Sequence, residues 1–440
     1  MSRPSREVLR TWYAALTLDA LDPSDPAETR YVPLLEAGRA AVDEMMATIE
    51  LAFDPTTQLL SGPNGSGKTT ELNRLRGDLN RAGFRVLMFD VTDYVNKSSP
   101  VYVTEFLIAL ALGAHDALGP TTEQDSPGFM PRLRRLLSRL KISLDVPGFT
   151  AAVSADGIEV EAPGASLEVD LQRELKTSQP FVAELRSKLR HNVGELYAEV
   201  AAFISERLAT EDPGQGWVMI VDGLEKLRGV TGNDAAVQQA AEELFVGHST
   251  ELKFRSHHTI YTVPTYLRFT APGALPYNSR VLQVPVPHVV PRKDEGPESV
   301  AETLDELREA VSRRIPVAEV FSSTAQLDHV VLASGGHLRD LFTLLLQLVN
   351  LTLRRSLELP LADEHVEEAI GYVAHDFAQM TAESQAFLLK VAASDGIVVP
   401  GASEVQMMAR LLTSHMLLGH TNGQDWYEVH PLTLRALDHR

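Results

Sequence analysis

The chain has 440 residues and no cysteine, and its 59 acidic and 40 basic side chains give a formal net charge of −19. This length allows two or three domains, and the lack of cysteine excludes a disulfide framework, a thiol nucleophile and thiolate metal sites. The acidic balance disfavours nucleic acid and anionic membranes as partners, and the charged N-terminus and short apolar runs predict a cytoplasmic protein with no membrane contact.

Apolar runs and amphipathic segments alternate through the first two thirds of the chain. Residues 1–33 are punctuated by proline and aspartate, and we expect an N-terminal lead-in with one helix there. Residues 34–291 are expected to form one core with a parallel α/β sheet, because alternating strands and helices favour that arrangement. The expected helices are residues 34–53, 67–79 and 101–118, and the expected strands lie within residues 57–62, 84–91, 217–227, 258–264 and 280–287.

A β insertion is predicted inside this core. Residues 142–170 alternate apolar and polar side chains, and Asp156-Gly157 between two such runs favours a β-hairpin. The hairpin would either dock a partner or cover apolar surface of the core. Residues 181–208, which follow, have the spacing of one long amphipathic helix.

Two further domains are expected after the core. Residues 298–372 predict a helical lid, and residues 376–440 have two helical segments and an Asn422-Gly423 hairpin, an order that looks like a winged-helix domain. The candidate recognition helix offers only Arg410 to DNA, and the wing has no lysine or arginine, so a protein contact is favoured. Met416, Trp426 and Tyr427 suit packing or protein contact. His420 and His430 could form a metal-binding pair across the hairpin, but a pair without a third ligand is usually not a metal site.

The segment GPNGSGKT at residues 62–69 fits the phosphate-binding pattern G-x-x-x-x-G-K-[ST], with an expected strand before it and a helix after it. Glycines let the loop wrap so that backbone N–H groups face phosphate oxygens, and the helix N-terminus favours negative charge. Lys68 is expected to reach the β- and γ-phosphates, and the Thr69 hydroxyl to coordinate Mg²⁺. The residues predicted to hold ATP are Gly62, Pro63, Asn64, Gly65, Ser66, Gly67, Lys68, Thr69 and Thr70.

A second acidic motif completes the predicted nucleotide site. Asp222 ends the apolar run VMIVD and is expected to share the Mg²⁺ ion with Thr69. Glu225 either polarises the attacking water, or caps the next turn, or pairs with a basic neighbour at the surface. About 150 residues separate the two motifs, so the strands that carry them should not be consecutive in sequence.

These motifs together resemble the AAA+/STAND branch of P-loop ATPases. The matching segments are GPNGSGKT, VMIVDGLEK, a strand that ends in TVP, and GGHLRDL, and the resemblance covers roughly residues 34–350. The second motif is similar to that of NACHT and related STAND ATPases, whereas typical AAA+ proteins have adjacent Asp and Glu, which leaves the water-activating residue open. The resemblance implies a P-loop NTPase fold of the ASCE/AAA+ type, with the lid, β-hairpin insertion and winged-helix-like domain attached.

The resemblance also implies roles for further residues. Thr262 falls where relatives carry a polar γ-phosphate sensor, with Thr265 as its rival. Arg280 matches the arginine that reaches a neighbouring subunit's nucleotide, and Arg339 matches the second sensor on the lid; either arginine could instead form a surface ion pair. Residues 31–33 correspond to the segment that flanks adenine.

The function expected from this resemblance is an ATP-driven conformational switch that hydrolyses ATP with Mg²⁺. Its partners would be further copies of the chain or a separate effector protein, as in bacterial signalling or defence. A DNA-binding initiator or loader is the first alternative, because a lid followed by a winged helix also describes that group. A scaffold that holds nucleotide without hydrolysing it is the second.

Overall fold

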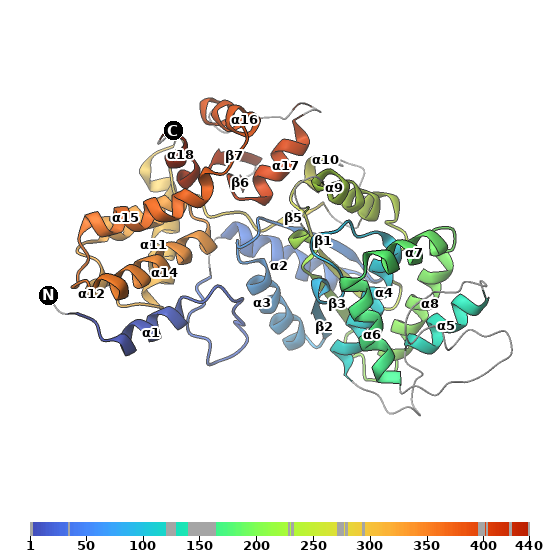
Figure 1. Cartoon of the computed structure of the whole chain (residues 1–440). Helices are drawn as coiled ribbons and strands as arrows, with labels where there is room; N and C mark the ends of the chain where they lie inside the picture. Colours follow the sequence, from blue (N-terminus) through green and yellow to red (C-terminus); the bar gives the residue numbers. More distant parts are fainter. Residues whose placement is uncertain are drawn as a thin grey trace. The chain divides into compact units, whose positions relative to one another are not determined.

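The computed structural model of the chain describes residues 3–33, 36–119, 129–139, 164–227, 229, 233–270, 277, 280–292, 295–394, 401, 404–421 and 425–438. The chain divides into two compact units, whose helices and strands are labelled in Figure 1. Unit 1 contains residues 1–44, 62–77 and 283–440, and unit 2 contains residues 45–61 and 78–282. None of the helices in this described part of the chain is both long and apolar enough to cross a membrane.

Unit 2 is built on a parallel sheet. In the described residues its strand order is β2-β3-β4-β1-β5, and β1–β4, β3–β4 and β2–β3 all pair in parallel. The strand β4 lies between β1, which leads into the phosphate loop, and β3, which ends at Asp222, so the predicted α/β P-loop fold is confirmed. The bounds are β1 (Thr57–Ser61), β2 (Arg85–Asp90), β3 (Trp217–Asp222), β4 (His258–Val263) and β5 (Leu282–Gln283).

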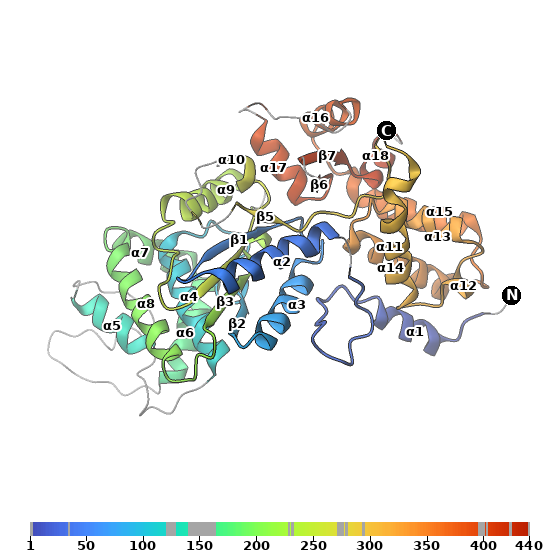
Figure 2. The same ribbon diagram turned by 180° about the vertical axis from the view of Figure 1, so that it is seen from behind.

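One buried helix anchors the helical layer of unit 2. Residues Val103–Ala114 of α4 (Val103–Leu118) are all buried, because the helix packs against both β2 and α8 (Figure 2). The other bounds are α2 (Glu36–Leu51), whose last part enters this unit, α5 (Phe129–Arg139), α6 (Gly164–Thr177), α7 (Gln179–Leu189), α8 (Val193–Leu208), α9 (Asp234–Glu242) and α10 (Leu267–Thr270).

Two predictions for this region are wrong in part. Residues 164–170 begin helix α6 instead of ending a β insertion; residues 142–163, with Asp156-Gly157, lie outside the described residues. In α6, Leu171 and Leu175 are buried at a four-residue spacing while Val169 is 62% exposed, which is a helical and not an alternating pattern. The long helix predicted over residues 181–208 is in fact two helices, α7 and α8, with a break at residues 190–192.

The helical lid in unit 1 shares one apolar core. Its members come from α11, α13, α14 and α15, and Leu9, Trp12 and Leu16 from the N-terminal segment belong to the same core. The N-terminal helix therefore packs with the lid. The bounds are α1 (Arg6–Ala15), α11 (Ala301–Ser312), α12 (Val317–Val320), α13 (Thr324–Ala333), α14 (Leu338–Arg355) and α15 (Asp363–Ala374).

The winged-helix domain has the predicted order of helix, helix and hairpin. Its elements are α16 (Ala382–Ala393), α17 (Val405–Thr413), the antiparallel strands β6 (Leu417–Thr421) and β7 (Asp425–Val429), and α18 (Pro431–Asp438), which we did not predict. The hairpin turn, residues 422–424, lies outside the described residues. Trp426 is buried and stacks on His420 at 4.2 Å between ring centroids, so it packs the domain as expected.

The segment after β5 leaves the sheet early and joins the wing. We expected a strand over residues 280–287, but Pro285 and Pro287 have no N–H to donate to a sheet ladder. Instead, the N–H of Val286 donates to the Gly419 carbonyl at 3.4 Å. The lid touches this segment at Gly336, whose φ is +78° and where an added β-carbon would lie 2.0 Å from the Pro287 carbonyl oxygen.

Gly336→Ala should therefore destabilise the protein by about 2–4 kcal/mol, because the side chain meets backbone and the positive φ adds strain. Gly371→Ala is the matched control, since Gly371 lies in helix α15 with only the Arg435 side chain near its added β-carbon, at 3.7 Å. That change should raise stability by up to about 1 kcal/mol. Chemical denaturation measures both values, and wild-type stability of Gly336→Ala would contradict the packing described.

Candidate nucleotide-binding site

The phosphate loop begins at Gly62, directly after β1, and ends where α3 (Lys68–Arg81) begins. The first N–H groups of a helix have no partner inside it, so they can bind an anion at that end of the helix. Gly65 has a φ of +96°, a conformation that side chains rarely adopt. The loop thus has the glycine-dependent path that the sequence predicted.

Polar groups of the loop fit a phosphate ligand. The Lys68 ammonium is buried and donates to the carbonyls of Gly62 and Pro63 at 2.9 and 2.8 Å. The Ser66 hydroxyl is buried and has no hydrogen-bond partner among the described residues. A buried cation beside an unsatisfied hydroxyl and a helix N-terminus is a favourable environment for negatively charged oxygens.

The first turn of α14 packs directly on the loop, within unit 1. A β-carbon built on Gly65 would lie 2.7 Å from Cβ and 2.9 Å from Nε of Arg339. The His337 ring also reaches the loop, where its Nε2 lies 3.0 Å from the Asn64 carbonyl oxygen. The structure therefore brings together the phosphate loop and Arg339, the predicted lid sensor. His337, three residues before Asp340, was not predicted to contact the loop.

The lead-in segment packs along α3. The Thr70 hydroxyl, predicted to bind nucleotide, accepts the N–H of Leu21 at 3.1 Å, and the Asn73 amide donates to the Leu21 carbonyl at 2.8 Å. The Tyr31 hydroxyl donates to Glu71 at 2.8 Å, and burial followed by the Glu71 charge raises the pKa of Tyr31. The segment predicted to flank adenine is thus held against α3 in unit 1.

The carboxyl ends of the parallel strands hold the other predicted residues, within unit 2. Asp222 ends β3 and is buried, and its carboxylate accepts the N–H of Gly223 at 2.8 Å. The same N–H also donates to the hydroxyl of Thr262 in β4 at 2.8 Å. Glu225 lies in the 3-10 turn after β3 and is buried, with 6% of its surface exposed.

A partly buried ion-pair group at this edge was missed by sequence reasoning. The Lys226 ammonium lies 2.6 Å from Asp90, at the end of β2, and 3.6 Å from Asp222. Burial alone lowers the pKa of Lys226, but attraction to Asp222 and the bond to Asp90 leave the pKa raised. Burial raises the pKa of Asp90, yet hydrogen bonds from Lys226 and Thr92 leave it lowered. Lys226 is therefore charged at neutral pH, and it keeps Asp90 ionised.

The remaining candidates are Arg280, Thr265, Arg410, His420 and His430. Arg280 is exposed just before β5, and Thr265 follows β4, whereas Thr262 lies inside that strand. Arg410 on α17 donates to the Ser384 hydroxyl at 2.7 Å, so it is engaged inside the winged-helix domain. His420 and His430 belong to different groups of contacts, because His420 stacks on Trp426 and His430 lies 3.1 Å from Asp340.

No protein-family model and no curated protein matches the chain. Among solved structures, the ORC1 protein of Aeropyrum pernix in complex with DNA is 13% identical with a TM-score of 0.41, over 97% of this chain and 96% of that chain. Drosophila ORC bound to DNA is 12% identical with a TM-score of 0.39, over 99% and 94% of the two chains. The ADP form of the Aeropyrum pernix ORC2 protein is 11% identical with a TM-score of 0.41, over 94% and 95%. These TM-scores are too low to support a function, so any functional assignment depends on the residues of this chain alone.

Proposed function

We propose that the chain is a Mg²⁺-dependent ATPase of AAA+ type that works as a conformational switch. The observation that carries this proposal is the packing of Arg339 and His337 on the phosphate loop at Gly65. A guanidinium at this place can respond to the charge of a γ-phosphate, and its helix belongs to the lid. ATP and ADP would therefore favour different positions of the lid helix relative to the loop.

The loop and the carboxyl edge of the sheet would act on the same nucleotide. This part of the proposal is supported by the chain itself, because β1 ends at Ser61 and the loop begins at the next residue. The strands β1, β3 and β4 are parallel, so Asp222 and Thr262 lie at the same edge as the end of β1. Ligands of open α/β sheets bind outside the carboxyl ends of the strands.

The donor set suits Mg²⁺, which prefers hard oxygen ligands and keeps several waters. Thr69 offers a hydroxyl, and Asp222 offers a carboxyl group that lies 3.6 Å from the Lys226 ammonium. Mg²⁺ would neutralise charge on the β- and γ-phosphate oxygens when it is bound. Lys68 would exchange its bonds to the loop carbonyls for bonds to phosphate oxygens.

Hydrolysis would use Glu225 to orient and deprotonate the attacking water. Glu225 is buried and follows β3, the strand that ends at Asp222. This position supports a catalytic role over that of a surface residue. Thr262 would act as a positioning residue, because its hydroxyl holds the Gly223 N–H at the start of the turn that carries Glu225.

The partner proposed is a second copy of the chain or a separate effector protein. Arg280 is exposed just before β5, and by the resemblance it would reach the nucleotide of a neighbouring copy. A role in signalling or defence stays a prediction from the resemblance.

Binding of duplex DNA is the second candidate, because the chain has a lid followed by a winged helix. The engagement of Arg410 by Ser384 and the lack of lysine and arginine in β6 and β7 count against it. Salt-dependent binding of duplex DNA near physiological ionic strength would favour this candidate. The third candidate is a scaffold that holds nucleotide without hydrolysing it. Such a protein would release no phosphate in a single-turnover experiment.

Lys68→Ala tests the nucleotide site. Loss of charge-assisted hydrogen bonds of about 2–3 kcal/mol should weaken ATP binding by about a hundredfold, measured by calorimetry with Mg²⁺. Lys97→Ala, at an exposed lysine, is the control and should bind ATP normally. Circular dichroism should show that both variants are folded. Wild-type affinity in folded Lys68→Ala would remove the central claim.

Arg280 should act only between subunits, because a guanidinium stabilises transition-state charge only at hydrogen-bonding range. Arg280→Ala should lose hydrolysis, and mixing it with Lys68→Ala should restore part of it, since a mixed interface combines one intact loop with one intact Arg280. Arg255→Ala, at another exposed arginine of unit 2, should hydrolyse ATP normally on its own. Normal hydrolysis by Arg280→Ala in an assembled oligomer would show that the assignment is wrong.

A further inference from the structure

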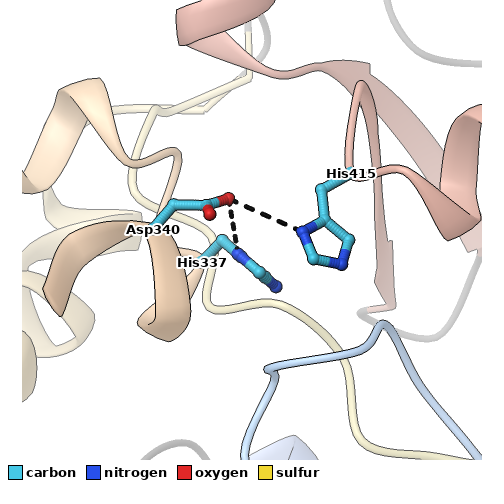
Figure 3. A group of neighbouring side chains, drawn as sticks. All are labelled: His337, Asp340 and His415. Atoms are coloured by element: carbon cyan, nitrogen blue, oxygen red, sulfur yellow. Dashed lines mark hydrogen bonds and ion pairs between the residues drawn. The ribbon is translucent and has the colours of Figure 1, made fainter. Parts of the chain in front are cut away.

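A group of buried histidines surrounds Asp340 in unit 1. His337 and Asp340 come from the start of α14, while His415 and His430 come from the winged-helix domain. We name these four residues the His–Asp cluster. From Asp340 Oδ2 the distances are 2.6 Å to His337 Nδ1, 3.1 Å to His430 Nε2 and 3.9 Å to His415 Nδ1. Figure 3 shows both His337 and His415 turned toward the carboxylate.

Three members of the cluster have the arrangement of metal ligands. One ligand atom from each of His337, Asp340 and His415 lies within 4.8 Å of the other two, and all three residues are buried. Two imidazole nitrogens and one carboxylate oxygen can bind a divalent transition-metal ion at about 2.0–2.2 Å and leave positions for water. Imidazole ligands favour zinc, iron, nickel or copper, whereas Mg²⁺ prefers oxygen ligands.

The hydrogen bonds of His337 indicate that a cation belongs beside Asp340. Its Nε2 faces the Asn64 carbonyl at 3.0 Å, and a carbonyl only accepts, so Nε2 carries a hydrogen. In a neutral ring, Nδ1 then presents a lone pair to the Asp340 carboxylate 2.6 Å away. Two acceptors at this distance repel each other unless a proton or a metal ion neutralises them. Opening the pair to about 3 Å would let both atoms coordinate one ion.

His415 approaches the cluster from a strained backbone. Its φ is +61°, in the left-handed region, which is strained for a residue other than glycine. This backbone directs the ring toward Asp340, with its centroid 4.3 Å from that of His337. Backbone strain that persists at a group of polar side chains is a recurring feature of ligand sites.

His430 fits the role of an outer partner. Its Nδ1 accepts the N–H of Leu432 at 3.1 Å, so the ring hydrogen sits on Nε2, which faces Asp340. Nε2 then has no lone pair for a metal but can orient the carboxylate. The Asn64 carbonyl likewise orients the His337 ring by accepting its Nε2 hydrogen. Such outer contacts are typical of metal-binding histidines and carboxylates.

We propose that His337 Nδ1, Asp340 Oδ2 and His415 Nδ1 form a binding site for a divalent transition-metal ion, for which Zn²⁺ serves as the probe. The ion clamps the first turn of α14 to the turn before β6, so it joins the lid to the winged-helix domain. The site is distinct from the Mg²⁺ ligands Thr69 and Asp222 and does not depend on ATP hydrolysis.

The test uses the full chain, stripped with a chelator and kept in excess Mg²⁺ without nucleotide. When Co²⁺ is titrated, a visible absorption band should grow until one Co²⁺ ion is bound per chain, and added Zn²⁺ should remove the band by competition. Zn²⁺ should also raise the melting temperature of the protein. His415→Asn should weaken Zn²⁺ binding by about tenfold or more, and asparagine tolerates the left-handed backbone. Asp340→Asn should do the same. His365→Asn, on α15 in the same unit, should bind Zn²⁺ like the wild type.

Two results would overturn the proposal. One is a wild type that binds no stoichiometric Co²⁺ or Zn²⁺, which would mean that a proton lies between His337 and Asp340. The other is a His415→Asn variant that binds Zn²⁺ as tightly as the wild type. If Asp340→Asn fails to fold, His415→Asn decides the outcome, because its backbone conformation is kept.

Discussion

The close approach of helix α14 to the phosphate loop is the contact on which the rest of the account depends. It requires a residue without a side chain at Gly65, because Arg339 occupies the space where a β-carbon would lie. It also joins the Asn64 carbonyl to His337, and through His337 to Asp340 and the winged-helix histidines. In the proposed switch, a ligand that moves the loop would act on the lid and the winged helix through these packed contacts.

Charged groups gather at the carboxyl edge of the sheet. Lys226 pairs with Asp90 and lies 3.6 Å from Asp222, so an ammonium group already stands beside the candidate magnesium ligand. Such preorganisation reduces the rearrangement needed when phosphate charge develops. In the proposed site, Mg²⁺ would share the Asp222 carboxyl group with this ammonium group.

Sequence reasoning reached the parts of the fold that local chemistry specifies. The glycine spacing of GPNGSGKT identifies its loop, and the apolar run that ends in Asp222 identifies the buried strand β3. It failed where one pattern fits two structures: the alternation of residues 164–170 hid the helical spacing that buries Leu171 and Leu175 and exposes Val169. It also missed Lys226 with Asp90, because that pair forms only when two strands distant in sequence end side by side.

Single-turnover phosphate release, with protein in excess over ATP and Mg²⁺ present, tests the central claim most directly. The account predicts that the wild type releases phosphate and that Glu225→Gln binds ATP with unchanged affinity but releases phosphate slower by about a hundredfold or more. Equal rates for the two proteins would contradict the role of Glu225. A wild type that binds ATP tightly and releases no phosphate would contradict the claim that this chain is an ATPase.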